Sequence, residues 1–139
     1  RSPALLSASH VGILRRIIAR GWDRSTSADP RNWSPANPAW GQGAATSLLV
    51  QRTFGGDLVR AEVRGVTHYF NRLPDGQIVD LTIDQFPLGA RLRNVSLTSR
   101  TDLMSLSGTA QRHQLLVDRV GAQVAAWARG RVGADRGVA

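Results

Sequence analysis

The segment Trp33–Phe54 constrains the fold most, because a loop rich in Pro, Asn and Gly changes there into an apolar helix. Apolar residues recur at helical spacing after Gly43, and the pair Gly55-Gly56 follows the last of them. Gly commonly supplies the left-handed residue that closes the last turn of a helix. The pattern therefore predicts a buried helix over residues 43–54 that is entered through a tight loop.

The start of this helix is a natural place for a reactive site. The first backbone N–H groups of a helix have no partners within it and lie at the positive end of its dipole. An enzyme can place a nucleophile and an oxyanion hole there. The residue at this position is Gly43, which has no side chain to react. Thr46 and Ser47 lie deeper in the helix, where we expect their hydroxyls to bond back to helix carbonyls.

Composition limits the chemistry that the chain can carry out. Its 139 residues, 42% hydrophobic and 20% charged, are typical of one globular domain, which we expect to span residues 1–139. The sequence has no cysteine, which excludes disulfides, thiolate metal sites and thiol catalysis. Its three histidines, His10, His68 and His113, lie far apart in the sequence, so we predict no metal site and no cofactor.

The chain is strongly basic, but its charge is not concentrated in one segment. The net charge is +8, and all 18 basic residues are arginines. No nucleic-acid-binding motif accompanies them, so we favour a solvated surface over a nucleic-acid site. No apolar run is long enough to span a bilayer, and residues 1–9 lack the apolar segment of a signal peptide. We expect a cytoplasmic protein with a small-molecule or peptide substrate and no membrane partner, of open oligomeric state.

Helix and strand patterns follow one another around the central helix. The sequence predicts an amphipathic helix over residues 4–20, ended by Gly21, and a long loop over residues 23–41. Three strands with two short turns are predicted next, at residues 58–63, 66–73 and 77–83. Residues 88–106 are predicted to be irregular, and a last helix, with Ser107 or else Thr109 as its N-cap, ends near Gly130 and leaves a mobile tail at 131–139. This order predicts an α+β fold in which the buried helix packs on an antiparallel sheet of about three strands, flanked by N- and C-terminal helices.

His68 and Asp80 are the candidates for an acid–base pair, with His68 in the second predicted strand and Asp80 in the third. A three-residue loop at 74–76 would place both side chains on one face of the sheet, diagonally offset. A two-residue turn at 75–76 would shift the register by one and place Asp80 opposite Asn71 instead. Pro74 favours the longer loop, so we predict a His68–Asp80 pair. Such a pair is half of a nucleophile–base–orienter set.

Several motifs of the chain resemble a known family. The motifs W-S-P-A-N-P-A-W-G-Q-x-A-x-T-x-L-x-V-Q, H-Y-x-N-R-L-P-D-G and D-L-T-x-D-Q-F, with the Gly pair at 55–56, resemble the bacterial YunG-like proteins. The resemblance covers residues 22–120. More distantly, the layout is similar to papain-like and transglutaminase-like thiol enzymes. In those enzymes a Cys at the start of a central helix is activated by a strand His, which an Asp or Asn on the next strand orients.

The resemblance implies a papain/transglutaminase-like domain with His68 as general base and Asp80 as its orienter. The family pattern has Cys after Gly-Gln, where this chain has Gly43. Gln42 matches the family's Gln and is implied to help hold an oxyanion together with the backbone N–H of Gly43.

Four further residues are candidates for contact with a substrate. Tyr69 and Asn71 belong to the same motif as His68, although strand alternation points Asn71 away from His68 unless a bulge intervenes. Trp33 and Trp40 of the long loop either line a pocket beside the central helix or seal the core under the loop.

Gly43 leaves three explanations open: an engineered knockout, a natural pseudoenzyme that kept its pocket, or a pocket in which His68 acts as general base without a covalent step. In each of them the parent chemistry, by resemblance, is attack on an amide or acyl carbonyl. The alternative is a non-catalytic binding module for a peptide, a small acidic metabolite or, least favoured, a nucleic acid. Replacing His68 by Ala separates the two classes, because only residual catalysis would be lost while binding is retained.

Overall fold

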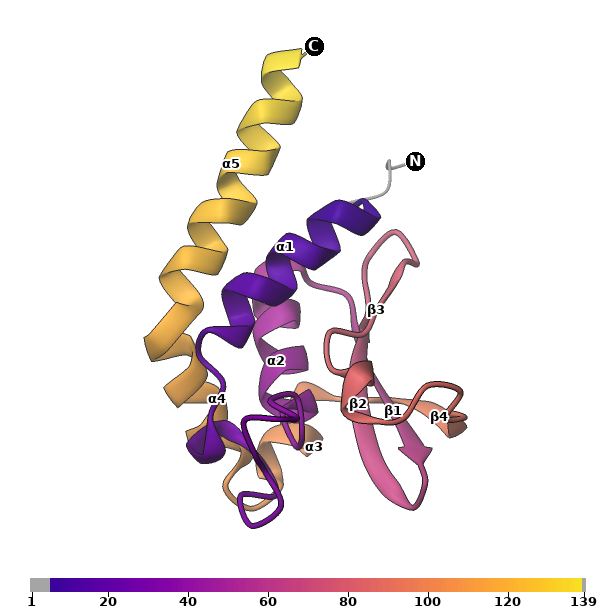
Figure 1. Cartoon of the computed structure of the whole chain (residues 1–139). Helices are drawn as coiled ribbons and strands as arrows, with labels where there is room; N and C mark the ends of the chain where they lie inside the picture. Colours follow the sequence, from indigo (N-terminus) through magenta and orange to yellow (C-terminus); the bar gives the residue numbers. More distant parts are fainter. Residues whose placement is uncertain (1–5, 139) are drawn as a thin grey trace.

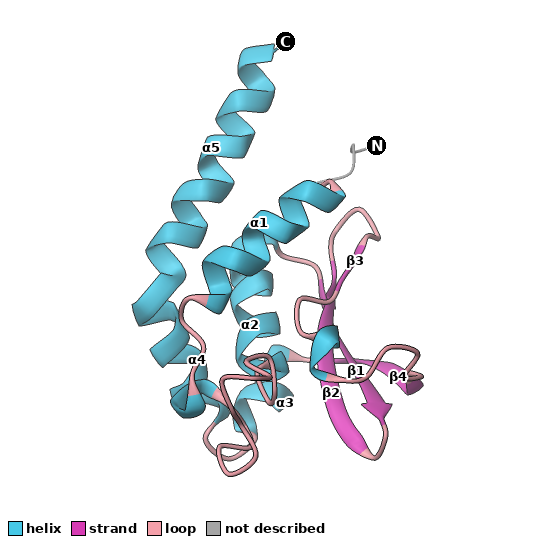
Figure 2. Cartoon of the chain, viewed as in Figure 1, coloured by secondary structure: helices cyan, strands magenta, loops and turns pink. Residues whose placement is uncertain are grey.

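The computed structural model describes residues 6–138, with side chains described through residue 131. It is a mixed fold in which helices and a four-stranded antiparallel sheet lie on opposite sides of one central helix (Figures 1 and 2). The elements follow in the order α1 (Ala8–Ala19), η1 (Arg24–Thr26), α2 (Gly43–Phe54), β1 (Asp57–Val63), β2 (Val66–Arg72), β3 (Ile78–Val79), η2 (Ile83–Gln85), β4 (Arg93–Thr98), α3 (Arg100–Ser105), α4 (Thr109–Leu116), η3 (Val117–Gly121) and α5 (Ala122–Val138).

The central helix is α2, and its bounds are those that the sequence predicts. All residues from 43 to 50 are buried, and Gly55 ends the helix with a φ of 77°. One side of α2 packs with α1 and α5 into the larger apolar core, through residues such as Leu49 and Val50. The other side packs on the sheet through Leu48 and Leu58. Because helices and sheet cover both sides, the N-terminus of α2 is held inside the molecule.

The sheet has the strand order β3-β2-β1-β4. Arg64 and Gly65 form the β1–β2 turn with φ values of 53° and 80°, which is the geometry of a two-residue hairpin with left-handed central residues. The β2–β3 pairing sets Asn71 against Val79, and the N–H of Leu73 donates to the carbonyl of Gln77. The predicted three-residue loop and its register are therefore confirmed.

Residues 77–83 differ from their prediction as one continuous strand. Only Ile78 and Val79 pair with β2, and η2 begins at Ile83. The chain leaves the sheet at Asp80, where the Oδ1 atom accepts from the N–H of Thr82 at 3.3 Å. This side chain–backbone bond turns the chain over the face of the sheet that carries His68.

The prediction that residues 88–106 are irregular is wrong. They contain β4, which pairs antiparallel with β1 at the edge of the sheet, and the short helix α3. Val95 and Leu97 of β4 are each 56% exposed, so pairing with β1 stabilises this strand more than burial does. Ser99 caps α3 by accepting from the N–H of Asp102.

The two terminal helices are confirmed with changed limits. Helix α1 begins at Ala8 with Ser7 as its cap, and the predicted start at residues 4–5 lies outside the described residues. Gly108, with a φ of 75°, precedes α4 in place of the predicted caps Ser107 and Thr109. The last helix continues through η3 and α5 to Val138 and does not end near Gly130 (Figure 1). The mobility predicted for residues 131–139 stays a prediction.

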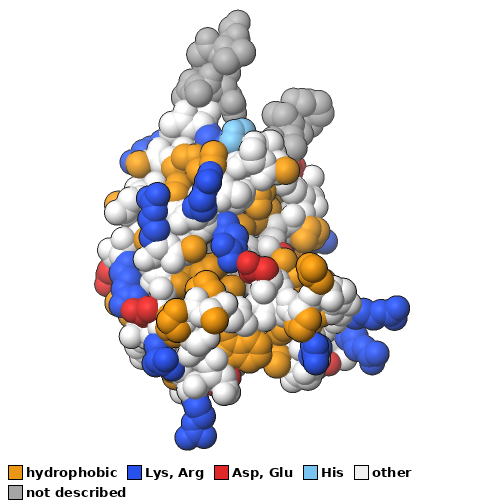
Figure 3. All heavy atoms as spheres, viewed as in Figure 1, with side chains coloured by type: hydrophobic (Ala, Val, Ile, Leu, Met, Phe, Trp, Pro, Cys, Tyr) orange, Lys and Arg blue, Asp and Glu red, His pale blue; other side chains and the backbone are white. Residues whose placement is uncertain are grey.

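Arginines are scattered over the visible surface, with polar and apolar atoms between them (Figure 3). Within residues 6–138, no helix combines the length and the apolar character that are needed to cross a membrane.

Candidate functional site

The predicted pair of His68 and Asp80 is present in the structure. The Nε2 atom of His68 lies 2.7 Å from Oδ2 of Asp80. The His68 side chain has no exposed surface, and the Asp80 side chain is 13% exposed. His68 comes from β2 and Asp80 from the point where the chain leaves β3, so the β2–β3 register brings the two side chains together. A short bond to a carboxylate fixes the orientation of an imidazole ring.

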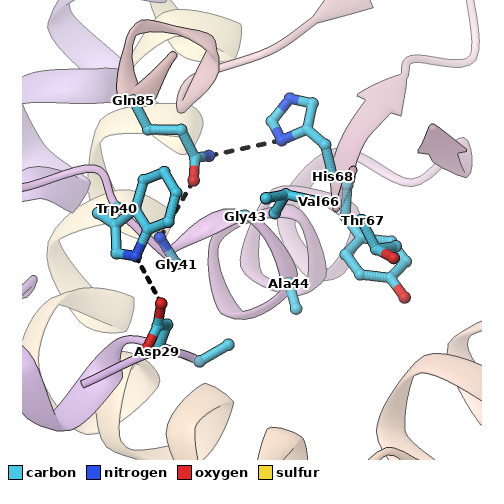
Figure 4. Close-up of a pocket in the computed structure, with 11 residues that line it drawn as sticks. Asp29, Trp40, Gly41, Gly43, Ala44, Val66, Thr67, His68 and Gln85 are labelled. Atoms are coloured by element: carbon cyan, nitrogen blue, oxygen red, sulfur yellow. Dashed lines mark hydrogen bonds between the residues drawn. The ribbon is translucent and has the colours of Figure 1, made fainter. Parts of the chain in front are cut away.

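Aromatic rings and one amide surround the rest of the His68 ring. Phe70 stacks on it with a centroid distance of 5.6 Å, and Phe86 meets it edge-on at 5.2 Å. The Nε2 atom of Gln85 lies 3.5 Å from Nδ1 of His68 (Figure 4). An amide N–H that faces Nδ1 requires a lone pair there, so the neutral ring carries its proton on Nε2 and donates it to Asp80. The basic nitrogen of His68 is therefore Nδ1.

Gln85 links His68 to the loop that precedes α2. Its Oε1 atom accepts from the N–H of Gly41 at 3.1 Å, and its Nε2 atom donates to the carbonyl of Thr82 at 3.0 Å. The side chain is buried and comes from η2. Sequence reasoning did not single out Gln85, and the only signal was its place in the D-L-T-x-D-Q-F motif.

The N-terminus of α2 lies beside this group, at the edge of β2. A Cβ atom placed on Gly43 would lie 3.1 Å from the carbonyl oxygen of Tyr69 and 3.4 Å from Oγ1 of Thr82. The distance of 3.1 Å is shorter than the usual distance between a Cβ atom and a backbone oxygen. Gly43 thus lets the helix start approach β2 more closely than another residue would allow.

A cavity of about 240 Å³ opens in front of Gly43 and His68. The long loop forms one wall, β2 forms the opposite wall, and the start of α2 and Gln85 lie between them (Figure 4). The described residues that line it are Ala28, Asp29, Trp40, Gly41, Gly43, Ala44, Val66, Thr67, His68, Tyr69 and Gln85. Among the candidates from the sequence, the cavity therefore gathers Gly43, His68, Trp40 and Tyr69.

Trp40 is held at the cavity by an acidic residue that the sequence analysis missed. Its Nε1 atom donates to Oδ2 of Asp29 at 3.0 Å, and Nδ2 of Asn32 donates to the same oxygen at 2.9 Å. The bonds from Asn32 and Trp40 hold the pKa of the Asp29 carboxyl below its usual value. Asp29 is therefore an ionised group in the wall of the cavity at neutral pH.

Three predicted residues have other positions. Gln42 is fully buried, and its Nε2 atom donates to the carbonyl of Asp23, on a side of α2 that is not part of the cavity lining. Asn71 points away from His68, as strand alternation predicts, and donates to the carbonyl of Ser47 at 2.9 Å. Trp33 donates to the carbonyl of Pro38 within the loop, under the guanidinium of Arg24. These contacts connect parts of the fold and do not supply the oxyanion or substrate contacts predicted for the three residues.

The hydroxyls inside α2 have structural partners. Ser47 donates to the carbonyl of Ala44, which confirms its prediction. Thr46 differs, because its hydroxyl accepts from the indole N–H of Trp22 at 2.9 Å. In the part of the chain that the structure describes, no three His, Asp or Glu side chains come together in a way that could hold a metal ion.

Comparison with known proteins identifies similar sequences. A family model described as YunG protein matches residues 10–125 of this chain. A protein of Bacillus subtilis (strain 168), described as "Uncharacterized protein YunG", is 30% identical over 73 residues, which cover 52% of this chain. The match spans 60% of that relative's own length. No solved structure matches the chain.

Proposed function

Because the chain belongs to the YunG family, we propose that its cavity is a papain/transglutaminase-like site that works without a thiol and binds a ligand carrying an amide or acyl group. The observation that carries the proposal is the 2.7 Å bond between Asp80 and Nε2 of His68, beside a cavity that His68 and Gly43 line together. In a nucleophile–base–orienter set, the ring nitrogen that does not bind the orienting carboxylate is the one that serves the nucleophile, and here that nitrogen is Nδ1. Gly43 occupies the position of the nucleophile here.

The ligand's carbonyl group has a place at the start of α2. The N–H groups of the first helical residues have no acceptor within the helix, and the helix dipole favours a partial negative charge beside them. Gly43 and Ala44 of this first turn line the cavity. His68 can accept a proton at Nδ1 from a group bound in the cavity once the Gln85 amide gives way, while Asp80 keeps the ring oriented.

A thiol introduced at position 43 tests the proposal. An unperturbed cysteine is only a few per cent ionised at neutral pH, and a neighbouring histidine lowers its pKa by stabilising the thiolate. We expect the Gly43→Cys variant to react with iodoacetamide at pH 6 at least about ten times faster than an Ala44→Cys variant, because in the proposed site His68 activates a thiol at position 43 and not one at position 44. Ala44 lines the same cavity in the same helical turn, which makes it a matched control.

The second control removes the base and keeps the thiol. Adding His68→Gln to Gly43→Cys should reduce the alkylation rate to that of Ala44→Cys. Since a Cβ at position 43 lies 3.1 Å from the Tyr69 carbonyl, Gly43→Ala measures separately what the added carbon costs in stability. Equal alkylation rates with and without His68, in variants that circular dichroism shows to be folded, would mean that the site is not of the proposed type.

Ligand binding without turnover distinguishes this site from a residual enzyme. For the unmodified chain we expect binding without turnover, and His68→Ala should leave that binding in place. The arginine-rich surface remains the basis of the alternative binding role. A nucleic-acid ligand stays disfavoured, because the arginines on the face shown in Figure 3 are scattered.

A further inference from the structure

The cavity differs in charge from the rest of the molecule. The chain contains 18 arginines and has a net charge of +8. None of these arginines is among the described residues that line the cavity, and Asp29 is the carboxylate in its wall. The described lining of this cavity therefore carries one carboxylate and no arginine, although the protein as a whole is basic.

Asp29 is built into the cavity wall by specific bonds. Its Oδ2 atom accepts from both Trp40 and Asn32, and Trp40 is itself a lining residue. The carboxylate is therefore fixed against an indole ring, in a loop whose backbone is joined to the start of α2 through the bond from Ala28 N–H to the Gly41 carbonyl at 2.8 Å. The cation that lowers the pKa of Asp29 is Arg31, which is exposed and does not line the cavity.

Aromatic side chains add to the preference for a cation. Trp40 stands on the loop wall (Figure 4), and Tyr69 of β2 is also a lining residue. The faces of indole and phenol rings attract ammonium and guanidinium groups, and the attraction adds to that of a nearby carboxylate. The volume of about 240 Å³ suits one side chain or another small group and not a large ligand.

We propose that the cavity selects a ligand in which an amide or acyl group is joined to a positively charged amine or guanidine, and that Asp29 and Trp40 bind this cation. The inference rests on the proposed function and specifies its ligand class. The expected ligand has the opposite charge to the acidic metabolite that a basic chain would ordinarily attract. Asp29 and Trp40 act as specificity residues, and His68, oriented by Asp80, faces the amide or acyl end.

Two probes that differ only in charge test this on the unmodified chain. Nα-acetyl-lysine methylamide and Nα-acetyl-norleucine methylamide carry the same amide groups and side chains of similar length, but only the first is a cation. Their affinities are measured by ligand-observed NMR titration. We expect the lysine probe to bind about fivefold more tightly, the effect of one partly exposed ion pair, and added salt to reduce this difference.

The Asp29→Asn variant assigns the preference to one residue. The Asn side-chain oxygen can still accept from Trp40 and Asn32, so the loop should keep its conformation. We expect this variant to bind both probes with the affinity that the norleucine probe has for the unmodified chain. Asp118→Asn makes the same change in net charge at an exposed residue outside the cavity lining and should leave the preference intact.

The possible results are distinguishable from failure of the proposed function. Equal affinities for the two probes, or binding of neither, would overturn the cation preference. A preference that survives Asp29→Asn would overturn its assignment to Asp29. Alkylation of the Gly43→Cys variant uses the neutral reagent iodoacetamide and does not depend on the cation preference. It therefore tests the proposed function independently of these results.

Discussion

Replacing Gln85 by Leu tests whether this residue holds the site together. Leu has a similar size but cannot accept the N–H of Gly41, which the Gln85 Oε1 atom now binds at 3.1 Å. The Thr82 carbonyl keeps a second donor, because the backbone N–H of Gln85 also binds it at 3.1 Å. The variant therefore leaves one partly buried donor without its acceptor, for which we expect a loss of about 1 kcal/mol of unfolding free energy.

Urea denaturation at pH 7 measures this loss, provided that the slope of the free energy with urea concentration is the same in both proteins. Gln111→Leu is the matched control, because it makes the same chemical change on an exposed helical residue and should alter stability by less than about 0.5 kcal/mol. If Gln85→Leu lowered the unfolding free energy no more than Gln111→Leu does, the hydrogen bonds of Gln85 would not stabilise the site. That result would refute the prediction.

Two further predictions concern residues around α2. Burial lowers the pKa of His113, and Arg100 and Arg52 act in the same direction, so the folded pKa lies below the ordinary value of 6.5. The full contribution of His113 to the free energy of unfolding is therefore present above pH 6.5, and it declines as the pH falls toward the folded pKa. Denaturation curves of a His113→Gln variant at several pH values should lack this decline. Asn71→Ala removes a buried bond to the Ser47 carbonyl and should cost about 1–3 kcal/mol by the same measurement, whereas a loss below about 0.5 kcal/mol would show that β2 and α2 do not depend on it.

The parts of the fold that the sequence predicts well are those with explicit local signals. Gly43 and the pair Gly55-Gly56 mark the two ends of α2, and the bounds 43–54 agree with the structure. Pro74 and Gly76 determine the β2–β3 loop, where Gly76 has a φ of 90°. Because strand register follows from loop length, this turn was enough to predict that His68 and Asp80 meet.

The parts that escaped prediction depend on contacts between distant segments. The alternation of Val95 and Leu97 was the local signal for β4, but a Ser- and Thr-rich context hid it, and both residues remain largely exposed at the sheet edge. Gln42 was expected at the oxyanion site because of its place in a motif. Its amide instead binds the carbonyl of Asp23, a contact that depends on the path of the chain between α1 and α2. Asp29 similarly reaches the cavity through a loop without a periodic pattern.

Nitrogen NMR of the His68 ring in the unmodified chain tests the central claim most directly. In the proposed site Asp80 holds the ring by Nε2, and Nδ1 presents its lone pair toward the cavity that His68 lines with Gly43. The neutral ring should therefore show a proton on Nε2 and the chemical shift of an unprotonated nitrogen at Nδ1, and Asp80→Ala should remove this preference. A ring that carries its proton on Nδ1 would have no base facing Gly43 and would contradict the account.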